Sequence, residues 1–242
     1  MIIIIRILGI WLISFSIQAQ QSLTVVSGLN KPPYVIQKNN SGFELELIRA
    51  IIQRMGKTVD FQYANFGRTS KMLDMSDIDA IMTTNARVFT DPSVLSQPYI
   101  KYQNVAVSLA ENNLSIERVA ELGRYKIVSF QMAHKILGRE FQYASLASPL
   151  YSQLGDQSKQ PGMLFRKRAD VLVMDKRIFF YMLQQSAWAD QTDKVMIHPI
   201  FPTTEYSMAF KDKQNVGLFN AELTKFLNSK EYVQLRKKYA FD

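Results

Sequence analysis

Apolar and polar positions alternate along the chain in short runs that predict strands followed by helices. Apolar, β-prone runs predict strands at 23–27 (LTVVS), 59–63 (VDFQY) and 78–84 (IDAIMTT), with helices at 43–55 and near 70–75 between them. Leu45, Ile48, Ile52 and Met55 repeat at helical spacing, and Gly56 follows where a left-handed helix end is least costly. The order strand, helix, strand favours parallel pairing with helices covering the sheet.

A second unit of the same kind follows the long β-prone run YQNVAVSLA at 102–110. Its predicted elements are, in chain order, a short helix at 116–122, a strand at 125–130, a helix at 133–143, a polar stretch at 152–162, a strand at 169–175 and a helix at 177–186. Strands at 195–200 and 205–210 and helices at 219–227 and 231–241 complete the chain. The last two helices need an apolar surface to cover, and the first unit offers the simplest one.

This return of the chain predicts an α/β fold with two lobes, each a mostly parallel sheet flanked by helices. The first lobe is predicted to hold residues 20–105 and 206–242, and the second lobe residues 106–205. Two crossing segments, near 104–110 and 199–206, would join the lobes as a hinge.

The segment NKPPY leads from the first strand to the first helix. Two successive prolines fix φ, so Lys31 to Tyr34 is predicted to be extended. Ser41 and Glu44 have the spacing of a capping box at the start of the helix. Tyr34 would then lie at the carboxyl end of a strand, where open α/β sheets form their binding crevices.

The first nineteen residues, MIIIIRILGIWLISFSIQA, predict a secretory signal cleaved after Ala19. The alternative is an uncleaved membrane anchor, but the apolar run is shorter than the roughly 18 residues that usually span a bilayer. There is no cysteine in the chain, so neither a disulfide, a thiolate metal site nor a lipid attachment to cysteine is expected. These features predict an exported protein that is free in the periplasm.

The formal net charge of +8 is spread among scattered basic residues and 21 acidic ones. A nucleic-acid-binding protein would be expected to show a clustered basic stripe or a recognition motif, and neither is present. We therefore expect no nucleic-acid partner.

Two places combine a strand end with polar side chains. Thr83, Thr84 and Arg87 follow one buried strand, and two hydroxyls with a planar guanidinium suit a carboxylate, although Arg87 alone would more often form a surface ion pair. Asp175 ends another strand directly before a helix. It is predicted to cap that helix, to face a ligand's ammonium group, or to do both with its two oxygens.

Four segments, taken together and in order, are similar to one known family. They are KPPYVIQKNNSGFELELI, DIDAIMTTNAR followed by LSQPY, KRADVLVMDKRIFFYML, and EYSMAFKD with the closing helices. On these segments the chain resembles the extracellular solute-binding proteins of family 3, which include the polar-amino-acid receptors of ABC importers. The resemblance spans nearly the whole mature chain and implies the type II periplasmic-binding-protein fold.

The resemblance also implies roles for single residues. Arg87 matches the arginine that grips the α-carboxylate of an amino acid, and Asp175 matches the acid that receives its α-ammonium group. Tyr34 and Phe66 match aromatic residues that enclose the ligand, with ordinary core packing as the alternative. The turn FQMAHK, which contains Gln131, replaces the family's small Gly and Ser or Thr turn, and the interval from Arg87 to SQPY is longer than usual. These departures leave open a ligand other than a standard α-amino acid.

The expected function is capture of a small zwitterion or carboxylate by hinge closure, without chemistry, and delivery to an inner-membrane ABC permease. The protein is expected to be a monomer without cofactor or metal. A periplasmic lyase or dehydratase is one alternative, with His134 as its acid–base group rather than a solvated histidine at a helix start. A ligand-sensing receptor that acts without transport is another. His198, beside Pro199, is expected to be structural.

Overall fold

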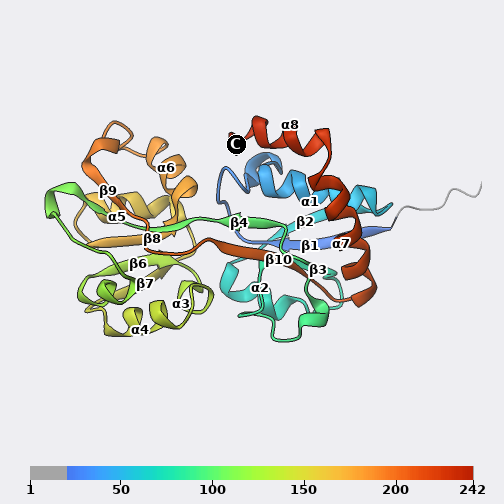
Figure 1. Ribbon diagram of the computed structural model, residues 1–242, viewed down its shortest axis with the longest axis horizontal. Helices are drawn as coiled ribbons and strands as arrows, with labels where there is room; N and C mark the ends of the chain where they lie inside the picture. The colour runs from blue at the N-terminus through green and yellow to red at the C-terminus, as the bar shows by residue number, and fades with distance from the viewer. Residues whose placement is uncertain (1–20, 242) are drawn as a thin grey trace, which may run out of the picture.

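The computed structural model describes residues 21–241, and the predicted signal peptide lies outside this range. Two five-stranded sheets lie side by side and form two lobes (Figure 1). The first sheet has the order β2-β1-β3-β10-β4 and the second the order β7-β6-β8-β5-β9. The predicted two-lobed α/β fold is therefore confirmed.

The first sheet combines parallel and antiparallel strands. Its strands are β1 (Ser22–Ser27), β2 (Thr58–Tyr63), β3 (Ala80–Thr84), β4 (Ile100–Tyr102) and β10 (Thr204–Phe210). β1 pairs in parallel with β2 and β3, whereas β10 is antiparallel to β3 and β4. Its helices are α1 (Phe43–Arg54), α2 (Phe66–Met72), α7 (Lys213–Leu227) and α8 (Lys230–Lys238). The two final helices return to the first lobe and pack on α1, as the sequence predicts.

The second lobe repeats the plan. Its strands are β5 (Asn104–Leu109), β6 (Ile127–Phe130), β7 (Tyr151–Leu154), β8 (Val171–Asp175) and β9 (Val195–His198). Its helices are α3 (Ala133–Ile136), α4 (Arg139–Ala147), α5 (Gln160–Phe165) and α6 (Lys176–Gln184). β7 lies in the stretch expected to be only polar, and Gly138, with φ of 95°, divides the single helix expected at 133–143.

The chain passes between the lobes twice. The β-prone run at 102–110 divides at Gln103, because β4 belongs to the first sheet and β5 to the second. The return runs from β9 to β10 through residues 199–203. Short 3₁₀ turns complete the connections, at Gln37–Asn39, Pro92–Val94, Ala110–Asn112, Val119–Arg124, Gln157–Lys159 and Thr192–Lys194.

The start of α1 differs from the sequence prediction. Ser41 and Glu44 form no capping box, and the N-cap is Gly42. Instead, the backbone N–H groups of Phe43 and Glu44 donate to the carbonyl oxygens of Pro33 and Tyr34, each at 3.0 Å. The segment from Lys31 to Tyr34 is a tight turn rather than extended, because the Tyr34 N–H donates to the Lys31 carbonyl oxygen at 3.1 Å. The turn thus provides the acceptors that the first turn of a helix needs.

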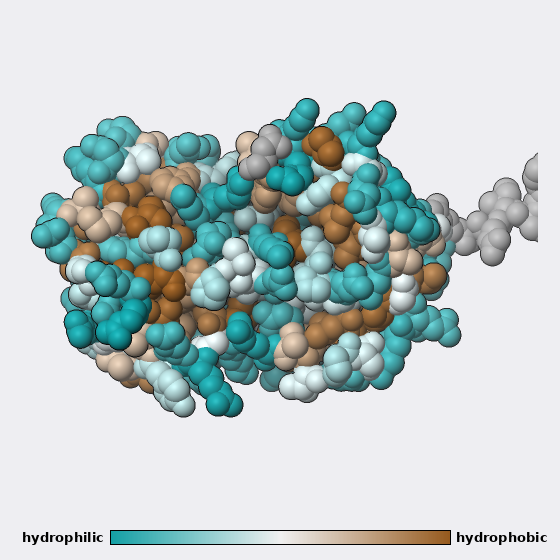
Figure 2. All heavy atoms as spheres, in the orientation of Figure 1, coloured by the Kyte–Doolittle hydropathy of each residue, from teal (hydrophilic) through white to brown (hydrophobic). Residues whose placement is uncertain are grey.

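The end of α1 follows the prediction, with Gly56 at φ of 76°. Across residues 21–241, every helix is too short or too polar to cross a membrane. Figure 2 shows hydrophilic residues interspersed with hydrophobic patches on both lobes, and the atoms of the two lobes meet in the middle of this face.

Candidate functional site

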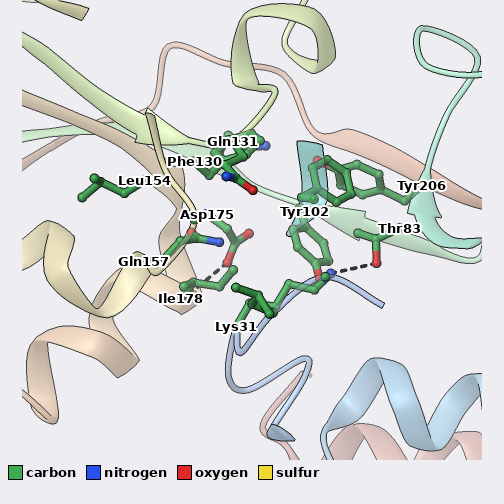
Figure 3. A pocket seen from close by; sticks show the side chains of 15 residues that line it. Lys31, Thr83, Tyr102, Phe130, Gln131, Leu154, Gln157, Asp175, Ile178 and Tyr206 are labelled. Atoms are coloured by element: carbon green, nitrogen blue, oxygen red, sulfur yellow. Dashed lines mark hydrogen bonds between the residues drawn. The ribbon is translucent and has the colours of Figure 1, made fainter. Parts of the chain in front are cut away.

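A pocket of about 50 Å³ lies between the two lobes, with walls from both sheets (Figure 3). Its polar side chains are Lys31, Thr83, Tyr102, Asn104, Gln131, Gln157, Asp175 and Tyr206. Its apolar side chains are Leu29, Phe66, Phe130, Leu154 and Ile178. Part of the wall lies at or just beyond the carboxyl ends of β1, β3, β6, β7 and β8, as expected for a crevice at strand ends. Tyr102, Asn104 and Tyr206 come from β4, β5 and β10.

Asp175 is the last residue of β8 and the N-cap of α6. Its Oδ1 accepts hydrogen bonds from the backbone N–H groups of Arg177 at 2.9 Å and Ile178 at 3.1 Å. Its Oδ2 accepts from the N–H of Gln103 at 2.9 Å and from the hydroxyl of Tyr34 at 3.2 Å. Burial outweighs these bonds and raises the pKa of Asp175 to about 6. The capping role expected from the sequence is confirmed, and the carboxylate also lines the pocket.

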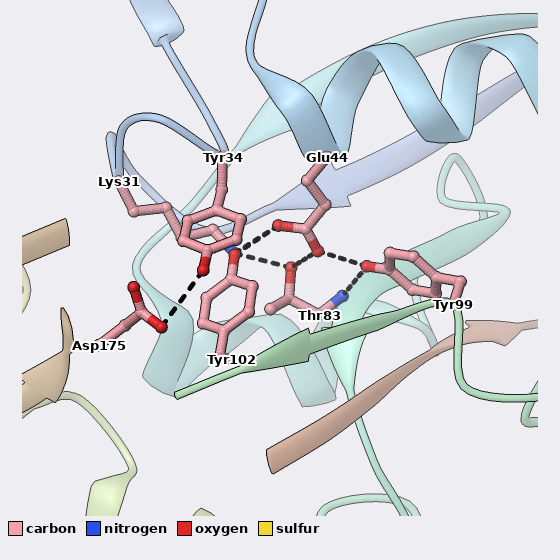
Figure 4. A network of polar contacts seen from close by, with 7 residues as sticks. All are labelled: Lys31, Tyr34, Glu44, Thr83, Tyr99, Tyr102 and Asp175. Atoms are coloured by element: carbon pink, nitrogen blue, oxygen red, sulfur yellow. Dashed lines mark hydrogen bonds and ion pairs between the residues drawn. The ribbon is translucent and has the colours of Figure 1, made fainter. Parts of the chain in front are cut away.

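Lys31 forms a buried ion pair with Glu44, with Nζ 3.0 Å from Oε2 (Figure 4). The same Nζ donates to Thr83 Oγ1 at 2.7 Å and to the Tyr102 hydroxyl oxygen at 3.1 Å. An ammonium group has three N–H donors, so the three contacts use all of them. Burial lowers the pKa of Lys31, although the nearby Glu44 opposes this.

Hydroxyl groups surround the other side of Glu44. Thr83 Oγ1 donates to Oε1 at 2.6 Å, Tyr102 donates to Oε2 at 2.6 Å, and the Tyr99 hydroxyl donates to Oε1. Burial raises the pKa of both tyrosines well above 10, which keeps their phenolic protons in place as donors. The charged pair is thus fully hydrogen-bonded, the condition under which a buried ion pair is tolerated.

The seven residues predicted from the sequence do not all reach the pocket. Four of them line it: Phe66, Thr83, Gln131 and Asp175. Tyr34 is outside this pocket wall but lines a neighbouring pocket together with Asp175, and it stacks on Tyr102 with ring centroids 3.9 Å apart. Thr84 is buried, and its Oγ1 has no hydrogen-bond partner within residues 21–241.

Arg87 has an exposed side chain outside the pocket wall. Its guanidinium reaches across to the second lobe, where Nη1 donates to the carbonyl oxygen of Ile136 at the end of α3. Gly138 lies beside this contact, and a Cβ there would be in ordinary van der Waals contact with Nη2 of Arg87 at 3.6 Å, so it is the φ of 95° that favours glycine at this position. The structure therefore separates Arg87 from Asp175 and places it in a contact between the lobes.

Lys31 and Glu44 are not among the site residues predicted from the sequence. One signal could have found Glu44, which lies one helical turn before Ile48 and two before Ile51 on the buried face of α1. A carboxylate on an apolar helix face needs a buried partner, and Lys31 follows the strand end that this face covers.

The two histidines lie outside the pocket wall. His134 is in α3, with its ring centroid 6.5 Å from that of Tyr151. His198 is in β9, with Nε2 2.8 Å from Ser108 Oγ in the neighbouring strand. No group of three or more His, Cys, Asp or Glu residues within the described part of the chain is arranged to hold a metal ion.

Comparisons with known proteins add to this geometry. A histidine kinase sensor domain with similarity to periplasmic binding proteins has a TM-score of 0.75 at 16% identity, over 91% of this chain and 96% of its own. A substrate-binding protein of an ABC uptake transporter from Streptococcus pneumoniae, with bound histidine, has a TM-score of 0.74 at 17% identity. The match covers 91% of this chain and 93% of that protein. An ancestral amino-acid-binding protein, described as a precursor of cyclohexadienyl dehydratase, has a TM-score of 0.71 at 17% identity. The match covers 90% of this chain and 95% of that protein.

At these identities the likeness shows the fold alone. No curated protein matches the chain. The family model of the bacterial extracellular solute-binding proteins, family 3, matches residues 23–242. Because this match covers nearly the whole chain, the protein belongs to family 3 of the bacterial extracellular solute-binding proteins.

Proposed function

We propose that this protein captures a small solute that carries an amino group, amino acids included, and delivers it to an ABC importer. The observation that carries the proposal is the buried carboxylate of Asp175 in the wall of the pocket between the lobes. A carboxylate removed from water binds an ammonium group more strongly than one on the surface. Membership of a solute-binding family supports binding without chemistry.

The mechanism is closure of the two lobes around the ligand. Thr83 and Phe66 come from the first lobe, whereas Gln131 and Asp175 come from the second. A ligand that touches both walls favours the closed form because it contacts both lobes only there. The segments at Gln103 and 199–203 are the places where the backbone would bend.

The grip of Arg87 on a ligand carboxylate stays a prediction. In this conformation the guanidinium binds the Ile136 carbonyl oxygen, so it would have to leave that contact to reach a ligand. Export through a cleaved signal at 1–19, a periplasmic location, a monomeric state and an ABC permease as partner are parts of the same proposal. The family's extracellular character supports export.

Two alternatives use the same fold. A lyase or dehydratase would need a general acid or base at the ligand, and His134, the residue considered for this, lies outside the pocket wall. A sensory receptor would use the same pocket and pass its closed form to a membrane partner. We favour capture for an importer, and the likeness to a sensor domain keeps the receptor as the second candidate.

A thermal-shift screen of the mature protein against amino acids, amines and small carboxylates tests the proposal. A ligand at one hundred times its dissociation constant adds about 2.7 kcal/mol of stability. Asp175→Asn should weaken the best ligand at least tenfold, because it removes the charge while an amide oxygen still caps α6. Asp156→Asn, an exposed cap beside the pocket, is the matched control. Unchanged affinity in Asp175→Asn would contradict the assigned site.

A further inference from the structure

The pocket wall has an unusual balance of charge. Of the side chains that line it within residues 21–241, only Lys31 and Asp175 carry a charge. Lys31 is neutralised by Glu44, and its three N–H donors all bind protein oxygens. Asp175 has hydrogen bonds but no ion-pair partner within the described chain. The net charge offered to a ligand is therefore negative.

A second polar atom in the wall points to the same kind of ligand. Gln157 Oε1 is buried and has no hydrogen-bond partner within residues 21–241. Such an atom is a free acceptor, and leaving it unpaired is costly. In Figure 3 the side chain of Gln157 lies beside that of Asp175. The amide nitrogen of Gln157 faces the carboxylate, and turning the amide over would place its unpaired oxygen there instead. Two acceptors side by side would then suit a donor group with several N–H bonds.

The rest of the wall suits a cation with an apolar body. Phe66, Phe130, Tyr102 and Tyr206 bring aromatic rings to the pocket, and the faces of such rings attract cations. Among residues 21–241, no free cationic donor lines the wall for a ligand carboxylate. The N–H groups of Lys31 already bind protein oxygens, and Arg87 lies outside the wall. Such a carboxylate would instead be buried near the like charge of Asp175, which is unfavourable.

We propose that the ligand of this pocket is a small primary amine that carries no carboxylate, with its ammonium group at Asp175 and Gln157 and its apolar part against the aromatic rings. This inference rests on the proposed function, because it assumes that the pocket captures a solute. It differs from that function in excluding the α-carboxylate of an amino acid.

Matched pairs of an amino acid and its decarboxylated amine give a direct test by isothermal titration calorimetry of the mature protein. Suitable pairs are valine with isobutylamine, leucine with isoamylamine, histidine with histamine, and phenylalanine with phenethylamine. We expect the amine of at least one pair to bind ten times or more tightly than its amino acid. An amino acid that binds more tightly than its amine would overturn this inference and leave the proposed function standing.

Two variants locate the binding. Gln157→Glu adds a second carboxylate and should raise the affinity for the amine several-fold. Asp175→Asn should lower that affinity at least tenfold. Asp156→Asn keeps the amine affinity, because Asp156 is exposed and outside the wall. Looser amine binding in Gln157→Glu would overturn the assignment even if Asp175→Asn did not fold. Absence of binding by every amine, amino acid and carboxylate tested would overturn the proposed function itself, and this inference with it.

Discussion

Tyr34 in the first lobe donates its hydroxyl hydrogen to Oδ2 of Asp175 in the second lobe, 3.2 Å away (Figure 4). Burial raises the pKa of Tyr34 well above 10, so the hydroxyl keeps its proton and remains a donor. The contact joins the loop that starts α1 to the cap of α6, and it holds the carboxylate at the edge of the pocket. The position of Asp175 therefore depends on both lobes.

Asp175 should make stability depend on pH. Its folded-state pKa of about 6 lies above the unfolded value of 3.8, so the folded protein binds this proton more tightly. The stability that the folded protein gains from binding this proton is fully present below about pH 4 and is lost as the pH rises through 6. Between pH 7 and pH 5 the free energy of unfolding of the wild type should rise by about 1 kcal/mol relative to that of Asp175→Asn.

Urea unfolding of both proteins at the two pH values measures this difference. Charged or titratable groups around the carboxylate are Lys31, Arg177, Tyr34 and Tyr206. Because both proteins contain them, their own titration largely cancels in the comparison. Parallel pH profiles for wild type and variant would contradict the raised pKa.

Loss of one member of the buried ion pair should be severe. Lys31→Met leaves Glu44 as a buried charge without a cation, which costs about 3 to 5 kcal/mol of unfolding free energy. The double variant Lys31→Met with Glu44→Gln should recover most of that loss, because no charge remains buried. Lys101→Met is the control, since its pair with Glu205 is exposed and worth at most about 1 kcal/mol. A double variant no more stable than the single one would contradict the role of charge.

Arg87→Met should lower the affinity for every ligand by a similar factor. The guanidinium bonds to Ile136 across the lobes, so its loss disfavours the closed form whatever the ligand. A partly buried hydrogen bond of this kind is worth about 1 kcal/mol, or roughly fivefold in affinity. Arg68→Met, which changes another exposed arginine of the first lobe, should leave affinity unchanged. A loss confined to ligands with a carboxylate would show instead that Arg87 grips that group.

Gly42 should tolerate no side chain. Its φ is 118°, and an added Cβ would lie 2.3 Å from the carbonyl oxygen of Tyr34. Gly42→Ala should therefore displace the Tyr34 turn and lower the unfolding free energy by roughly 2 to 4 kcal/mol. Gly217→Ala, in the middle of α7 with open space around it, should stabilise the protein by about 1 kcal/mol. Thermal denaturation compares the stability of the two variants. Unchanged stability in Gly42→Ala would contradict the tight packing of this loop.

Most of the architecture follows from local patterns along the chain. Apolar runs of strand length alternate with helical periodicity, and this order predicted two α/β units with the last helices returned to the first. It also located Asp175, because an aspartate between a buried strand and an apolar helix is a capping residue in almost any fold. These features are local, since they depend on the burial pattern and backbone needs of neighbouring residues.

Which charged side chains meet depends instead on contacts between distant parts of the chain. Glu44 has the spacing of a capping box, yet its partners Thr83, Tyr99 and Tyr102 are 39, 55 and 58 positions away. Arg87 follows a strand end like Thr83, yet it extends to the opposite lobe. A charged side chain takes the partner that folding brings within a few ångströms in a low-dielectric interior, and sequence spacing does not encode that distance.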